Sequence, residues 1–214
     1  METGEKALAI AVLNQALNDF TEGCSMYTEA RKSLEKKGTL PNGYSMIIHR
    51  FNESADFFTA KTRGHRLLLI LWTELADSDP DVMASKFKAV LRGEGKLGSV
   101  DYYPNIRDKW VCDAYLHNDK IKKEEEKLRL FKKGSKDYND CEVKINSFYK
   151  ETEFFIRKNE EKISQLEEKR YYANNPQVID EKIKDLELVN KIYREKSTGN
   201  KHSNIVYKFE ENYC

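Results

Sequence analysis

The sequence is poor in the residues that break helices or staple small folds. Its 214 residues include only four prolines, ten glycines and four cysteines. The cysteines, Cys24, Cys112, Cys141 and Cys214, form no CxxC pair, which argues against a disulfide framework and against a zinc knuckle. The shortage of helix breakers favours long helices, and unpaired cysteines fit a reducing compartment.

Long apolar runs are also missing. The most apolar stretch, residues 67–72, is far shorter than the roughly 20 residues that a membrane-spanning helix needs. Residues 1–12 contain too few apolar side chains for a secretory signal. The sequence therefore predicts a cytoplasmic protein, either soluble or peripheral at a membrane.

An excess of charge of one sign is absent from the chain as a whole. Lysine and arginine together number 37, against 36 aspartates and glutamates. A polyanion is therefore not attracted by net charge, and any such attraction must come from local clusters of basic residues.

Apolar residues at alternating three- and four-residue steps predict long amphipathic helices. A first helix is expected over residues 3–37, and a second from Ser45 to about residue 76, where Asp79 and Pro80 signal a new start. The first stripe is Ile10, Leu13, Leu17, Phe20, Cys24, Tyr27 and Leu34; the second is Ile48, Phe51, Ala55, Phe58, Thr62, His65, Leu69 and Trp72.

The rest of the chain predicts a loop followed by a long helical hairpin. We expect N-terminal helices over 1–92, a surface loop over 93–104, and a hairpin over 105–214, the latter either separate from the first part or continuous with it. The hairpin turns at the Asn-Asn-Pro corner of 174–176, and Gly134 is a possible interruption of its first arm. A last helical segment is expected near 205–209. The fold class predicted is all-α: an elongated, coiled-coil-like bundle, expected to be dimeric, in which the apolar stripes close either within one chain or between two.

No group of residues predicts catalysis. The glycines of 93–98 fit the letters of a dinucleotide-binding fingerprint, but a helix precedes them where that fingerprint needs a buried strand. His49 and Glu53, four residues apart, are too few ligands for a metal ion. We therefore expect no enzyme activity, no catalytic or metal-binding residue, no cofactor and no small-molecule substrate.

Basic residues gather in one part of the predicted hairpin. Residues 120–136 hold eight basic and three acidic side chains. A solvated helix face is one interpretation, and contact with a polyanion is the other. Few aromatic residues lie among the lysines, so nucleic acid is a less suitable partner than anionic lipid, which needs only a positive surface. The candidate lipid-binding residues here are Lys120, Lys122, Lys123, Lys127, Arg129, Lys132 and Lys133.

A second set of candidate lipid contacts lies near the corner: Lys158, Lys162, Lys169 and Arg170. The charged segment 160–170, the Ala173-Asn174-Asn175-Pro176 corner and the alternating acidic and apolar residues of 179–187 resemble the junction between the second and third helices of BAR domains, most closely those of sorting nexins. The resemblance covers about residues 148–210. It implies a homodimer that binds curved anionic membrane through basic residues.

Two functions are thus expected. The first is a curvature-associated helical dimer that recognises anionic lipid through basic helix faces. The alternative is a soluble coiled-coil scaffold, adaptor or inhibitor that binds another macromolecule, with a protein as the partner.

Overall fold

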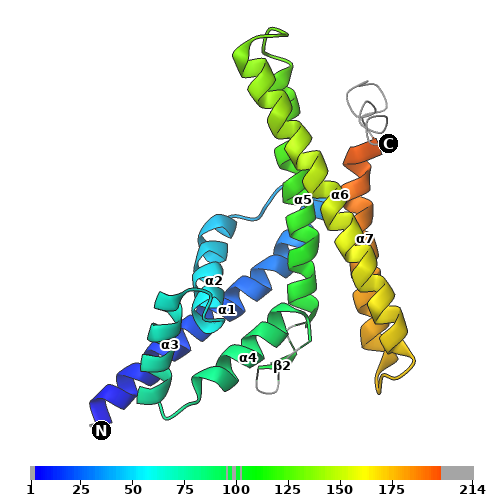
Figure 1. Ribbon diagram of the computed structural model, residues 1–214. Coiled ribbons are helices and arrows are strands. Elements are labelled where there is room, and N and C mark those ends of the chain that lie inside the picture. The colour runs from blue at the N-terminus through cyan, green and yellow to red at the C-terminus, as the bar shows by residue number, and fades with distance from the viewer. Residues whose placement is uncertain (1–2, 95, 98–99, 102, 199–214) are drawn as a thin grey trace, which may run out of the picture. The chain divides into compact units, whose positions relative to one another are not determined.

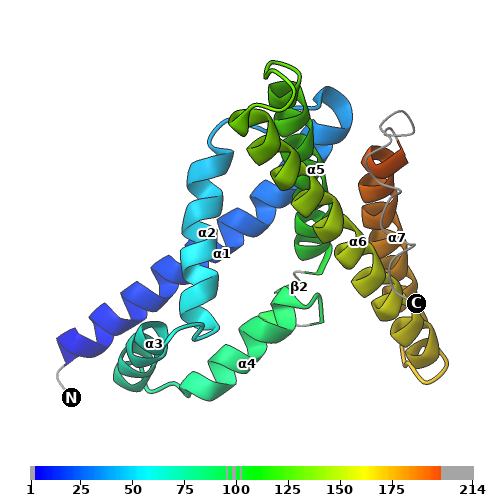
Figure 2. The ribbon, with the colours of Figure 1, turned by 45° about the horizontal axis from the view of Figure 1, so that its top comes forward.

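The computed structural model describes residues 3–94, 96–97, 100–101 and 103–198, and these residues are almost entirely helical (Figures 1 and 2). The helices are α1 (Thr3–Lys37), α2 (Tyr44–Phe58), α3 (Arg63–Leu75), α4 (Pro80–Leu91), α5 (Tyr103–Leu128), α6 (Lys136–Arg170) and α7 (Pro176–Thr198). Two antiparallel strands of two residues each, β1 (Lys96–Leu97) and β2 (Val100–Asp101), lie between α4 and α5. The all-α prediction is confirmed for this part of the chain.

The chain forms two compact units, residues 1–112 (unit 1) and 113–214 (unit 2). The division falls inside α5, whereas the domain limits expected from the sequence lay around 93–104. Those limits stay a prediction. The expected segment at 205–209 lies outside the described residues.

The helix expected from Ser45 to about residue 76 is wrong, because the structure has two helices there. Thr59 ends α2, and Ala60 follows with a positive φ of 52°. The Thr62 side chain then accepts a hydrogen bond from the backbone N–H of His65 at 3.2 Å, as the N-cap of α3. Thr62 had been assigned to the apolar stripe, so a capping residue at stripe spacing hid the break.

Other helix limits agree with the sequence. The span of α1 is the one expected, and Gly38 follows it at a φ of 66°. Asp79 caps α4 by accepting from the N–H groups of Asp81 and Val82. The described residues of 93–104 include β1 and β2, and α5 begins at Tyr103, one residue before Pro104. Gly134 does interrupt the first hairpin arm, between α5 and α6, with a φ of 84°.

Unit 1 is built around packed aromatic rings. Phe20 of α1 stacks on Phe51 of α2 with 5.0 Å between ring centroids, and Phe87 of α4 meets Phe20 edge-on at the same distance. Phe58 stacks on Phe87 at 3.9 Å. The close approach of α1 and α2 depends on Gly23, where a Cβ would lie 2.3 Å from the Cβ of Phe51.

Unit 2 brings together α6, α7 and the second half of α5. Its apolar core includes Ile121, Ile145 and Leu186, and polar side chains tie the helices together. The Asn118 amide donates to the backbone carbonyl of Ile192 at 2.6 Å, and the Asn159 amide donates to Asn190 Oδ1 at 2.9 Å.

His117 is one of the buried titratable side chains of unit 2. Its Nε2 lies 2.9 Å from Thr152 Oγ1 and 3.3 Å from the carbonyl oxygen of Phe148. The rings of Phe148, Phe155 and Tyr193 surround it edge-on at 5.6 to 5.9 Å. Burial lowers the pKa of this histidine below its usual value, against the opposing effect of the Phe148 carbonyl.

We expect unit 2 to lose stability as the pH falls below about 6.5, the usual histidine pKa. The unfolded chain binds a proton at His117 more readily than the folded chain, so acid favours unfolding until the pH passes the lowered folded pKa. Urea unfolding followed by circular dichroism at pH 7, 6 and 5 measures this effect. The variant His117→Gln should show a weaker pH dependence, whereas the control His49→Gln, at a side chain that is 71% exposed, should behave as wild type.

Candidate functional site

All eleven residues expected to bind lipid have exposed side chains, but they do not form one surface. Seven belong to the end of α5 and the turn that follows it, and four belong to the later part of α6. The two turns of unit 2 lie at opposite ends of α6 (Figure 1), whose 35 residues span about 50 Å at 1.5 Å per residue. The sequence prediction therefore separates into two candidate contact regions.

The first region is the turn between α5 and α6, here called the basic tip and defined as residues 127–136. Backbone hydrogen bonds hold the start of the turn, from Leu130 N–H to the Lys127 carbonyl at 2.9 Å and from Phe131 N–H to the Leu128 carbonyl at 3.3 Å. Ser135 closes it as the N-cap of α6. The turn therefore has a defined backbone rather than a frayed helix end.

The charge of the basic tip is strongly positive. It contains five basic and no acidic residues. Lys127 pairs with Glu124 at 2.5 Å, but Arg129, Lys132 and Lys133 form no ion pair with the described part of the chain. Their charge is therefore available to an anionic surface.

Two large apolar side chains stand exposed among these cations. Leu130 is 84% exposed and Phe131 is 38% exposed. Leu130 also lines a shallow groove of about 410 Å³, together with Phe148, three lysines and two glutamates: Lys120, Lys123, Lys127, Glu124 and Glu126. Neither apolar residue was predicted as a contact from the sequence, because the prediction rested on charge alone. The signal was present in the sequence as a Leu-Phe pair flanked on both sides by basic residues.

Some of the expected lipid contacts are neutralised within the chain. Lys123 pairs with Asp119 at 2.7 Å, and Lys122 lies 4.0 Å from Glu126. Arg170 pairs with Asp180 at 2.8 Å. Because these ion pairs are exposed and weak, they can reopen at an anionic surface, but each contributes less than an unpaired cation.

The second region is the turn between α6 and α7, here called the tyrosine tip and defined as residues 169–175. Tyr171 is 88% exposed and Tyr172 is 92% exposed, next to Lys169 and Arg170. Lys158 and Lys162 lie on α6 two to three turns before it, and the Lys158 ammonium is 5.9 Å from the centre of the Phe154 ring. This tip resembles the basic tip in composition, with fewer unpaired cations.

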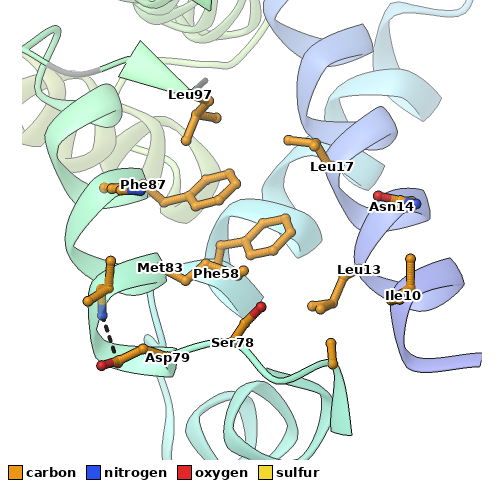
Figure 3. A pocket seen from close by; sticks show the side chains of 13 residues that line it. Ile10, Leu13, Asn14, Leu17, Phe58, Ser78, Asp79, Met83, Phe87 and Leu97 are labelled. Atoms are coloured by element: carbon orange, nitrogen blue, oxygen red, sulfur yellow. Dashed lines mark hydrogen bonds between the residues drawn. The ribbon is translucent and has the colours of Figure 1, made fainter. Parts of the chain in front are cut away.

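Unit 1 contains a separate apolar pocket of about 610 Å³ (Figure 3). Its floor is the stacked pair Phe58 and Phe87, and one wall is the first half of the α1 stripe, Ile10, Leu13 and Leu17. The opposite wall comes from α4 and β1, through Val82, Met83 and Leu97. Polar lining residues are Asn14, Ser78, Asp79 and Lys86. The stripe expected to pack in a coiled coil thus faces a cavity over its first half.

The described residues contain no group of three or more His, Cys, Asp or Glu side chains placed to hold a metal ion. His49 and Glu53 lie 3.8 Å apart, and both side chains are 71% exposed. Within the same residues, no helix has both the length and the apolar character required to cross a bilayer.

With this geometry in view, the chain matches no protein-family model, no curated protein and no solved structure.

Proposed function

We propose that this protein binds anionic membrane surfaces, with the basic tip as the principal contact. The observation that carries the proposal is the combination of the exposed Leu130 and Phe131 with unpaired cations on the same turn, among them Arg129, Lys132 and Lys133. Interfacial membrane-binding segments combine these two features, since apolar side chains enter the acyl boundary while cations meet the headgroups.

The magnitudes favour a joint action of charge and insertion. Three unpaired cations contribute on the order of 3 kcal/mol at an anionic surface. Partial burial of Leu130 and Phe131 contributes a similar amount, given about 1.5–3 kcal/mol for a fully buried side chain. Either contribution alone corresponds to millimolar affinity or weaker, whereas the two together reach the micromolar range. Binding should therefore require both.

Co-sedimentation of the full chain with vesicles tests the proposal. We expect pelleting with phosphatidylserine-containing vesicles at low salt, much less with phosphatidylcholine alone, and a steep loss as salt shortens the Debye length. No pelleting with anionic vesicles at low salt would contradict the proposal.

The two tips can be ranked in the same assay. The double variant Lys132→Glu and Lys133→Glu should weaken binding about 30-fold or more, because two headgroup attractions of about 1 kcal/mol each are lost and replaced by repulsion. The matched variant Lys169→Glu and Arg170→Glu should have the smaller effect, since Arg170 is already paired with Asp180. Equal effects would mean that both tips touch the membrane.

The resemblance to BAR modules adds a homodimer and a preference for curved membrane to this proposal. The end of α6 at Arg170 and the start of α7 at Pro176 support the helix, corner and helix order of that resemblance. Sedimentation velocity measures the oligomeric state, and vesicles of decreasing diameter measure the curvature preference.

A second candidate function is a scaffold that binds a protein partner. It is favoured by one observation: α3 exposes Leu67, Leu68 and Leu71, each at least 48% exposed, on a helix of 13 residues. Patches of this kind mark protein contacts as well as membrane contacts. A chain with these three leucines changed to serine tests whether they serve membrane binding. If it still binds vesicles, the leucines are not membrane contacts, and the scaffold function is separate from the membrane function.

A further inference from the structure

The apolar pocket of unit 1 lies in the space between α1 and α4. Figure 3 shows Leu13 and Leu17 of α1 on one side and Met83 and Phe87 of α4 on the other, with Phe58 between them. At about 610 Å³ the pocket falls within the range of about 300–1,000 Å³ typical of small-molecule sites. Two apolar lining residues are partly exposed, Ile10 at 43% and Val82 at 49%, so the mouth of the pocket is apolar as well.

We infer that this pocket binds a single-chain amphiphile with an anionic head, of the long-chain fatty acid class. The aliphatic and aromatic lining suits a flexible hydrocarbon chain, which gains from burial without needing a matched set of hydrogen bonds. A ligand with many polar groups would leave them unsatisfied against Leu13, Leu17 and Phe58. The ligand is proposed as a bound molecule and not as a substrate.

The polar side chains of the pocket indicate which charge the head group of the ligand carries. Among the described residues that line the pocket, Lys86 carries the one positive charge, and its exposed ammonium forms no ion pair with any described residue. The Asp79 carboxylate is already engaged as the N-cap of α4, with Oδ1 at 2.8 Å from the Asp81 N–H and at 3.1 Å from the Val82 N–H. A carboxylate head can therefore pair with Lys86, with Asn14 and Ser78 as further hydrogen-bond donors.

Binding of cis-parinaric acid, a fluorescent fatty acid, to the full chain tests this inference, with palmitate as the competitor. We expect saturable binding at one site that palmitate displaces. Lys86→Glu should weaken binding about tenfold or more, while Lys88→Glu, an exposed lysine on the same helix that does not line the pocket, should leave it unchanged.

A pocket-blocking variant separates this site from general apolar surface. Val82→Trp fills the mouth from a half-exposed position, so unit 1 should still fold, and binding should be lost. Leu68→Trp, at a similarly exposed position on α3 outside the pocket, should bind as wild type. Equal binding by Val82→Trp and wild type would overturn the site, and equal binding by Lys86→Glu and wild type would overturn the anionic head.

Fatty acid binding in the pocket of unit 1 is independent of the proposed membrane binding through the basic tip. The variant Lys132→Glu and Lys133→Glu should weaken vesicle binding and keep fatty acid binding, because both residues belong to unit 2. Displacement of cis-parinaric acid by an amphipathic helical peptide but not by palmitate would replace the fatty acid with a peptide as the occupant and overturn the inference.

Discussion

Replacing Leu130 and Phe131 with aspartate should reduce binding to anionic vesicles by about 100-fold or more. The change removes about 3 kcal/mol of insertion and adds two negative charges beside Arg129, Lys132 and Lys133, which weakens their attraction to the headgroups. Each 1.4 kcal/mol is a tenfold change in affinity. Vesicle co-sedimentation at fixed salt measures the loss.

The fold should tolerate this double change. Leu130 and Phe131 are both exposed, and the turn is held by backbone hydrogen bonds and by Gly134 and Ser135, which the change leaves in place. The control is Val143→Asp, which introduces a charge at a 68% exposed apolar residue of α6 outside the basic tip. Undiminished binding by the double variant, or an equal loss in the control, would remove the basic tip from the proposal.

Gly23→Ala should destabilise unit 1 by about 2 kcal/mol, the upper end of the overpacking cost less the gain in helix propensity. Its new Cβ would lie 2.3 Å from the Cβ of Phe51, an atom fixed to the α2 backbone, so the two helices must move apart. Phe51 is 1% exposed and packs against Phe20 and Tyr27, so the shift also disturbs the aromatic core. Overpacking typically costs about 1–3 kcal/mol or more and exceeds the gain of about 1 kcal/mol in helix propensity.

The same helix provides the control. Gly4 also lies in α1, and a Cβ there would meet no atom within 4 Å, so Gly4→Ala should be neutral or slightly stabilising. Both tryptophans, Trp72 and Trp110, belong to unit 1, so their fluorescence during urea unfolding reports on that unit. Equal stabilities of the two variants would show that α1 and α2 do not pack as closely as described.

Local chemistry let the sequence predict the start and end of most helices. Asp79 with Pro80, Gly38, Gly134 and the corner before Pro176 act within a few residues of chain, through caps and backbone conformations that the residues themselves prefer. Thr62 was misassigned because a threonine at stripe spacing is compatible with both a helix interior and an N-cap. Only the packing of α2 and α3 distinguishes the two.

The candidate sites depended on the tertiary structure to different degrees. The positive charge of the basic tip can be predicted from the sequence alone, because residues 127–136 contain no acidic side chain. The exposure of Leu130 and Phe131 cannot be predicted from the sequence, since the same residues in a continuous helix would belong to an ordinary apolar stripe.

What the sequence by itself determined is the helical class, most helix limits and the clusters of basic residues, all of which depend on neighbours along the chain. Only the tertiary structure decided that Ile10, Leu13 and Leu17 of the α1 stripe face a pocket while Phe20, Cys24 and Tyr27 are buried, and that the candidate lipid contacts separate into two regions of unit 2. The physical reason is that burial and cavities depend on which helices approach one another, and a periodic stripe of apolar residues predicts a face without specifying what covers it.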